Sequence, residues 1–200
     1  MLSVVVQAGG ESQRMGENKA LKSFLGHPLI GRVVDRVRPI ADEMILTTNH
    51  PELYEFIEAR KIPDLQPGLG PLGGLHTALY SAQFETVAVV ACDMPFASPA
   101  LLLAAADILR REAADVVIAE SPEGFEPMHA VYRRQTCVPA IEGAIQAGQR
   151  RVISWFGAVR VRRLTPEELQ QHDPDGMAFW NVNTPEEFAR AEERARAAET

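Results

Sequence analysis

The sequence has little cysteine, no long apolar run and only moderate glycine and proline. Two cysteines among 200 residues fit neither a zinc-binding spacing nor a disulfide framework. The longest uncharged apolar runs, residues 87–92 and 101–106, are much shorter than the ~20 residues that span a bilayer. Residues 1–6 lack the basic stretch that opens a signal peptide. These absences predict a soluble, cytoplasmic protein that does not insert into a membrane.

Positive charge is also scarce, because 20 Lys and Arg stand against 27 Asp and Glu, for a formal net charge of −7. An acidic chain is a poor general binder of nucleic acid, whose affinity rests on neutralising phosphates. Apolar residues, by contrast, make up 46% of the chain, which excludes a disordered protein. At this length we expect one domain, residues 1–200, that folds without a metal or disulfide.

Short β-branched runs alternate with longer helical patterns over the first 120 residues, and the alternation then loosens. The pattern predicts strands at residues 2–7, 43–48, 86–91, 115–119, 129–132 and 159–163. It predicts helices at 28–37, 49–60, 72–82, 100–111, 138–147 and 185–198, and capping boxes that begin at Thr165 and Thr184. Such alternation is typical of an α/β fold. We expect a three-layer α/β/α domain with a mostly parallel, Rossmann-like sheet.

The loop after the first predicted strand, AGGESQRMGENK at residues 8–19, has the composition of a phosphate site. Gly9 and Gly10 let backbone N–H groups approach an anion, while Arg14 and Lys19 supply charge. The loop matches neither the GxxxxGK[ST] nor the GxGxxG pattern, which disfavours P-loop ATPases and dinucleotide dehydrogenases. An ordinary connection with solvated charges is the alternative, and the combination of both glycines with both cations argues against it.

Asp93 follows the predicted strand at residues 86–91, at the edge of the sheet where the phosphate loop also lies. A lone Asp after a strand is more often a helix cap or turn former than a metal ligand. Mg²⁺, however, typically binds one or two carboxylates together with substrate phosphates. A carboxylate that faces a cationic phosphate loop therefore predicts a nucleotide site that uses Mg²⁺.

Six motifs follow one another in a recognisable order: AGGESQRMGENK at 8–19, GPLGGL at 70–75, CDMPF at 92–96, EPMHAVY at 126–132, GQRRV at 148–152 and NVNTPEE at 181–187. With them the chain resembles the molybdenum cofactor guanylyltransferase family over almost its whole length. The resemblance implies transfer of GMP from GTP to molybdopterin with release of pyrophosphate. Other molybdenum cofactor biosynthesis proteins and molybdoenzyme chaperones are further partners of such an enzyme.

The resemblance also implies roles for individual residues. Arg14, Lys19 and Asp93 are the expected catalytic residues, and Asp93 is also the expected metal ligand. Backbone groups of Gln7, Ala8, Gly9 and Gly10 are expected against GTP. The remaining expected GTP contacts are Thr47, Asp64, Gly70 and Gly73, and the expected acceptor contacts are Arg150, Arg151, Asn181 and Asn183. Residues 1–120 would then form a nucleotide-binding half, and residues 121–200 an acceptor-binding half.

The sequence departs from the family pattern at a few positions. Gln7 replaces the usual Leu, Asn18 replaces a common Asp, and Thr47 occupies the place of a nucleotide-binding Asn, with Asn49 two residues on. Three other functions remain open: cytidylyl transfer to the same cofactor, nucleotidyl transfer to another phosphorylated metabolite, and a nucleotide-binding module without catalysis. Intact Arg14, Lys19 and Asp93 argue against the last, and Asp64 with the GQRRV motif argues against the first two.

Overall fold

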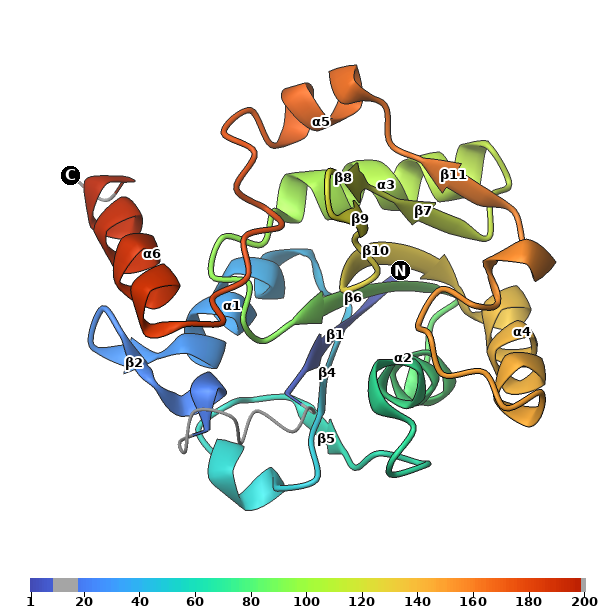
Figure 1. The fold of residues 1–200 in the computed structure, drawn as a ribbon, viewed down its shortest axis with the longest axis horizontal. Coiled ribbons are helices and arrows are strands. Elements are labelled where there is room, and N and C mark those ends of the chain that lie inside the picture. The colour runs from blue at the N-terminus through green and yellow to red at the C-terminus, as the bar shows by residue number, and fades with distance from the viewer. Residues whose placement is uncertain (9–17, 199–200) are drawn as a thin grey trace.

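A computed structural model describes residues 1–8 and 18–198 of the chain. Its centre is a seven-stranded sheet with the strand order β11-β7-β10-β6-β1-β4-β5 (Figure 1). β10 runs antiparallel to both of its neighbours, and the other strands run parallel to one another. The strands are β1 (Leu2–Gln7), β4 (Glu43–Thr47), β5 (Arg60–Ile62), β6 (Thr86–Ala91), β7 (Val116–Ile118), β10 (His129–Arg133) and β11 (Val161–Arg163).

Helices cover both faces of this sheet (Figure 1). On one face Val4 and Val6 of β1 pack with α1 and α3, and on the other Val5 packs with α2 and α4. Because β1 is buried on both faces, its sequence is an unbroken apolar run rather than an alternating one. The helices are α1 (Leu29–Val37), α2 (Gly70–Ser81), α3 (Pro99–Arg111), α4 (Arg134–Gln146), α5 (Pro166–His172) and α6 (Pro185–Ala198). The expected three-layer α/β/α fold with a mostly parallel sheet is confirmed.

Side-chain caps fix where three of the helices begin. The Ser98 hydroxyl accepts a hydrogen bond from Leu101 N at the start of α3. Thr165 and Glu168 form the expected capping box at α5. At α6, Thr184 Oγ1 accepts a hydrogen bond from Glu187 N, and Glu187 Oε2 accepts one from Thr184 N. The second expected capping box is therefore also present.

The helix expected over residues 49–60 is wrong. The segment forms a single 3₁₀ turn, Pro51–Tyr54, and then the strand β5, which pairs in register with Ile45–Thr47 of β4. Tyr54 and Ile57 are buried, which is enough for one turn but gives no continuous apolar stripe. α4 also begins four residues earlier than expected, at Arg134.

The C-terminal helix α6 packs against a small hairpin of β2 (Ser23–Phe24) and β3 (His27–Pro28). Leu25 and Gly26 connect these strands with φ values of 52° and 86°, as a two-residue turn with two positive φ angles requires. Phe24 and Phe188 pack edge to face with ring centroids 5.4 Å apart. Just before α6, Val182 N donates to Asp93 O at 3.0 Å, which holds this segment beside the end of β6.

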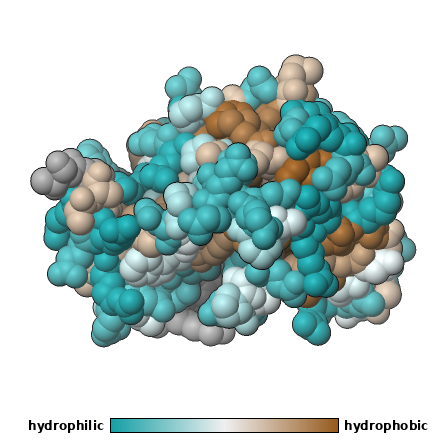
Figure 2. Space-filling view, turned by 90° about the horizontal axis from the view of Figure 1, so that it is seen from above, coloured by the Kyte–Doolittle hydropathy of each residue, from teal (hydrophilic) through white to brown (hydrophobic). Residues whose placement is uncertain are grey.

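The surface on the side of α5 is mainly hydrophilic, with small brown areas between the teal ones (Figure 2). No helix within residues 1–8 and 18–198 has the length and apolar content needed to cross a membrane.

Candidate active site

The carboxyl ends of four parallel strands meet in one row at one edge of the sheet. Ala8 N donates to Thr47 O at 3.0 Å, which joins the ends of β1 and β4. Thr48 N donates to Ile62 O at 2.8 Å, and Cys92 N donates to Gln7 O at 3.0 Å. Residues that follow these strands therefore gather along this edge, as expected for an open α/β sheet.

Lys19 and Asp93 meet at this edge. Lys19 lies in a short 3₁₀ turn, Lys19–Leu21, which Asn18 caps by accepting a hydrogen bond from Ala20 N. Lys19 Nζ lies 2.8 Å from Asp93 Oδ2, and the two side chains are only 10% and 20% exposed. The same Nζ donates to Asn183 Oδ1 at 2.9 Å. The structure thus brings together two of the expected catalytic residues and one expected acceptor residue.

Asp93 retains an oxygen that can take a ligand. Its Oδ1 is buried and has no hydrogen-bond partner among the described residues. A buried carboxylate oxygen without a partner is unfavourable, so this atom is suited to a cation. Among residues 1–8 and 18–198 no group of three or more His, Cys, Asp or Glu side chains is arranged to hold a metal ion. Asp93 therefore fits a metal that takes its remaining ligands from substrate phosphates and water.

Cys92, next to Asp93, is not a nucleophile. Burial, together with the neighbouring Asp93 carboxylate, raises the pKa of the Cys92 thiol to about 12. The thiol is therefore protonated at neutral pH and lacks the thiolate that nucleophilic chemistry needs.

A second carboxylate, Asp64, follows β5 and is held by Asn49, which follows β4. Asp64 N donates to Asn49 Oδ1 at 2.8 Å, and Asn49 Nδ2 donates to Asp64 Oδ2 at 3.1 Å. Asp64 Oδ1 is buried and has no partner among the described residues. Its free oxygen can accept hydrogen bonds from a ligand, and Asn49 fixes its orientation. We did not expect this pairing, because it depends on β5, which the sequence pattern does not indicate.

Gln7 and Ala8 offer the site less of their backbone than expected. Gln7 O and Ala8 N already bond to Cys92 and Thr47 within the sheet. The side chain of Gln7 is the more available group, since Gln7 is 6% exposed and its Nε2 has no partner among the described residues. Thr47 is 1% exposed and is the partner of Gln7 in the parallel pairing of β1 with β4.

The glycines of the GPLGGL motif have different structural roles. Gly70 begins α2 with a φ of 60°, so a side chain there would be strained. A Cβ on Gly73 would lie 2.7 Å from Leu69 Cβ, and one on Gly74 would lie 3.0 Å from Gln7 Oε1. Gly73 therefore allows the close turn into α2, while Gly74 makes room for the Gln7 side chain.

The expected acceptor residues lie on two segments. Arg150 follows α4 and donates from Nη1 to Gly68 O at 2.9 Å, which ties the GQRRV segment to the loop before α2. Arg151, the next residue, is exposed. Asn181 Nδ2 donates to Phe179 O at 3.3 Å, and Asn183 contacts Lys19 as described above.

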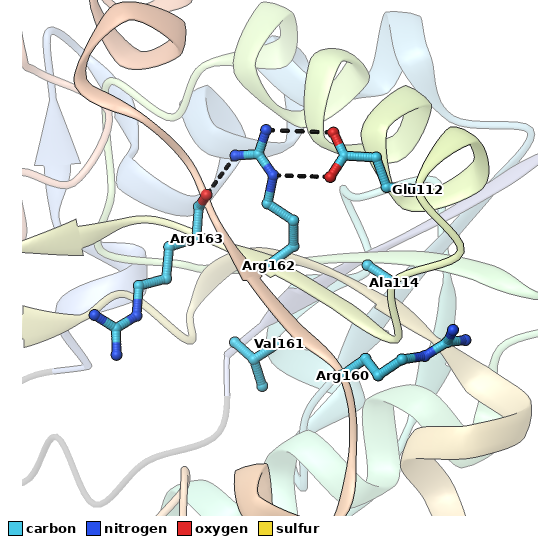
Figure 3. A pocket seen from close by; sticks show the side chains of 6 residues that line it. All are labelled: Glu112, Ala114, Arg160, Val161, Arg162 and Arg163. Carbon is cyan, nitrogen blue, oxygen red and sulfur yellow. Dashed lines mark hydrogen bonds and ion pairs between the residues drawn. The ribbon is translucent and has the colours of Figure 1, made fainter.

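The arginines of residues 160–163 lie apart from this site. They line a separate hollow of about 340 Å³ beside β11 (Figure 3). Arg162 pairs with Glu112 and Glu168, which together raise its pKa, and each of the other two arginines also faces a carboxylate. These other pairs are Arg160 with Asp115 and Arg163 with Glu120. The arginines at positions 160, 162 and 163 therefore belong to ion pairs with carboxylates around this hollow.

Three expected site residues, Gly9, Gly10 and Arg14, lie outside the described residues. For them the sequence argument stands alone.

The family model described as "MobA-like NTP transferase domain" matches residues 4–163. The chain belongs to the MobA-like NTP transferase family. A molybdenum cofactor guanylyltransferase of Desulfosudis oleivorans is 37% identical over 194 residues, with 96% of this chain and 95% of the relative covered. A probable molybdenum cofactor guanylyltransferase of Pelotomaculum thermopropionicum is 36% identical, with 98% and 94% covered.

A solved structure agrees with these relatives. Molybdopterin-guanine dinucleotide biosynthesis protein A from Archaeoglobus fulgidus superposes with a TM-score of 0.85 and 29% identity, over 98% of this chain and 99% of that one. As a member of an NTP transferase family the chain is a nucleotidyltransferase. Such enzymes generally use a divalent metal ion, and Asp93 Oδ1, which has no partner within residues 1–8 and 18–198, fits that requirement.

Proposed function

We propose that this protein transfers GMP from GTP to the phosphate of molybdopterin, releases pyrophosphate and uses Mg²⁺. The observation that carries the proposal is the Lys19–Asp93 pair at the carboxyl edge of the sheet, in a chain that guanylyltransferases match over nearly its full length. An ammonium and a carboxylate with a free oxygen are the groups that a metal–nucleotide phosphate needs.

The reaction is an in-line displacement. An oxygen of the molybdopterin phosphate attacks the α-phosphorus of GTP, and the bond from that phosphorus to the pyrophosphate oxygen breaks. The attacking phosphate is already ionised at neutral pH, so no general base is required. Catalysis therefore rests on positioning and on stabilising charge.

Three groups carry out that stabilisation. Lys19 and Arg14 bind phosphate oxygens, and Asp93 would hold Mg²⁺. A bound Mg²⁺ would supply positive charge that stabilises the negative charge that develops on the pyrophosphate. Backbone N–H groups of Gly9 and Gly10 complete the phosphate site.

Guanine is recognised by Asp64. Guanine presents a ring N–H and an amino group side by side, and a carboxylate accepts hydrogen bonds from both. Asp64 Oδ1 has no partner in the described part of the chain and can accept these bonds, and Asn49 holds Asp64 in place. Gln7, Thr47, Gly70 and Gly73 are the remaining residues that we assign to GTP.

Molybdopterin binds on the side of residues 148–151 and 181–183. Arg151 is exposed and its guanidinium suits a phosphate that must be both held and aimed. Arg150 lies next to Arg151 and also holds the loop at Gly68. Asn181 contacts the pterin. We assign residues 1–120 mainly to the nucleotide and 121–200 mainly to the acceptor, with Asn183 between the two. Proteins that deliver or receive the cofactor are the expected macromolecular partners.

The deciding experiment incubates the purified protein with each of the four NTPs, MgCl₂ and molybdopterin, and measures pyrophosphate release and the dinucleotide formed. GTP is expected to be the preferred donor, with release dependent on molybdopterin. Preference for CTP would instead support cytidylyl transfer to the same cofactor. Release with a sugar phosphate but not with molybdopterin would contradict the proposed acceptor, and binding of GTP without any transfer would contradict catalysis.

A further inference from the structure

Asn183 lies far from Lys19 in sequence but contacts it directly. Lys19 Nζ donates to Asn183 Oδ1 at 2.9 Å and to Asp93 Oδ2 at 2.8 Å. Asn183 would belong to the acceptor-binding half if the chain were simply divided at residue 120. The contact places it instead beside a group that binds the nucleotide.

The backbone around Asn183 is fixed from both sides. Immediately before it, Val182 N donates to Asp93 O at 3.0 Å. Asn183 N donates to Glu187 Oε2 at 2.7 Å, as part of the capping box of α6. Asn183 can therefore orient a mobile side chain, because its own position is set by the sheet edge and by a helix.

Lys19 needs such a partner. A lysine ammonium is a point charge on a flexible four-carbon stem, so its direction is set by its acceptors. One of these acceptors, Asp93, also has the oxygen suited to a metal ion. When Asp93 binds that ion, its attraction for Lys19 weakens. The neutral amide oxygen of Asn183 continues to accept from Lys19, and it adds no negative charge that would repel phosphates.

We propose that Asn183 is a positioning residue that aims the Lys19 ammonium at the nucleotide phosphates. The inference rests on the proposed nucleotide site. It assigns to Asn183 a role in nucleotide binding that its place in the acceptor-binding half does not indicate.

The test is a double-mutant cycle on nucleotide affinity, measured by isothermal titration with GTP and MgCl₂ in the absence of molybdopterin. Asn183→Ala is expected to weaken GTP binding about tenfold, within the range for one hydrogen bond to a charged group. In a Lys19→Ala background the same substitution is expected to change GTP affinity less than about twofold, because Asn183 acts through Lys19. Gln171→Ala, at an exposed position of α5 outside the proposed site, is the matched comparison and is expected to bind GTP as the wild type does.

Two results would overturn the proposal. In the first, Asn183→Ala binds GTP as the wild type does while its KM for molybdopterin rises, which makes Asn183 an acceptor contact. In the second, the tenfold loss persists in the Lys19→Ala background, which makes its role general support of the fold. If the wild type binds another NTP in place of GTP, the guanine assignment fails and the cycle is run with that NTP, because Lys19 faces the phosphates common to all four.

Discussion

Asn49 and Asp64 hydrogen-bond to each other in both directions, across the ends of two neighbouring strands. One oxygen of Asp64 is used in this pair and the other is buried without a described partner. A ligand that donates to the second oxygen replaces a missing bond, and a ligand that cannot donate leaves it missing. If Asp64 contacts the base as proposed, the free energy of binding differs between a base that donates to this oxygen and a base that does not.

Asp64→Asn is expected to reduce the preference for GTP over ATP by at least about tenfold, because an amide replaces one of two acceptor oxygens with a donor. Asn49→Ala is expected to reduce the same preference, because the Asp64 side chain would lose the hydrogen bond that holds its orientation. Initial rates with each NTP measure the effect. Asp107→Asn, on the exposed side of α3, is the control. An unchanged GTP preference in Asp64→Asn would contradict guanine recognition by this residue.

Asp93→Asn is expected to lower Mg²⁺-dependent turnover about a hundredfold or more, since the amide keeps the shape of the side chain but not its charge. A titration of turnover with MgCl₂ measures this, and the melting temperature shows whether the fold is intact. If Asp93→Asn reached wild-type turnover, and did so at the same MgCl₂ concentration as the wild type, Asp93 would be ruled out as the metal ligand.

Arg150 and Arg151 are expected to differ despite being neighbours. Arg151→Ala should raise the KM for molybdopterin about tenfold and leave GTP affinity nearly unchanged. Arg150→Ala should affect both substrates, because Arg150 also holds the carbonyl of Gly68 in the loop before α2. Titrations with GTP and MgCl₂, and separately with molybdopterin, distinguish the two variants. Equal behaviour of both would show that the contact with Gly68 has no effect on nucleotide binding.

Gly73→Ala is expected to destabilise the protein by about 1–3 kcal/mol, since the new Cβ would lie 2.7 Å from Leu69 Cβ and 3.2 Å from Gln66 O. Urea unfolding measures the change. Gly143→Ala in α4 is the control, because that site is exposed and nothing lies within 4 Å of the added atom. The control is expected to be neutral or slightly stabilising, because Ala favours helix. Equal stability of the two variants would contradict the close approach at Gly73.

Burial of His129 makes stability depend on pH. Burial lowers the pKa of His129 to about 4, and its neutral Nε2 accepts a hydrogen bond from Ser98 N at 3.0 Å. In the unfolded chain a histidine titrates near 6.5. The unfolded state therefore binds the extra proton first, and this contribution is fully present above pH 6.5 and is lost as the pH falls to about 4.

The loss is expected to reach about 3 kcal/mol, the equivalent of a shift of roughly two and a half pKa units. Urea unfolding between pH 7 and pH 4 measures it in the wild type and in His129→Gln. The difference in unfolding free energy between the wild type and His129→Gln should become smaller toward low pH. The control His50→Gln, at an exposed histidine, should show the same pH dependence of stability as the wild type. A constant difference across this range would show that His129 is not buried in its neutral form.

The local pattern of apolar residues was sufficient to predict the central strands of the sheet. β1 and β6 are runs of apolar residues covered on both faces, so their bounds follow from the sequence directly. β5 is only Arg60–Ile62, two of its residues are cations, and it forms because β4 offers a free edge. No periodicity within three residues reveals such a strand.

The site shows the same division. The rule for the carboxyl ends of parallel strands placed Asp93 and Lys19 at one edge, and both are there. Asn49 and Asp64 are 15 residues apart, and their contact requires β5 to be a strand. Lys19 and Asn183 are 164 residues apart, and their contact requires α6 to dock on the hairpin at Phe24. Contacts of this kind depend on tertiary packing, which spacing along the chain does not encode.

The last strand of the seven-stranded sheet ends at Arg163, and the match to the family model also ends there. A fragment cut at that point would keep all seven strands and lose both Val182 N, which bonds to Asp93 O, and Asn183. Its sheet would be complete, but its lysine would have one partner in place of two. The proposed active site therefore extends beyond the part of the chain that the strands define, and a boundary chosen from the sheet alone would pass through it.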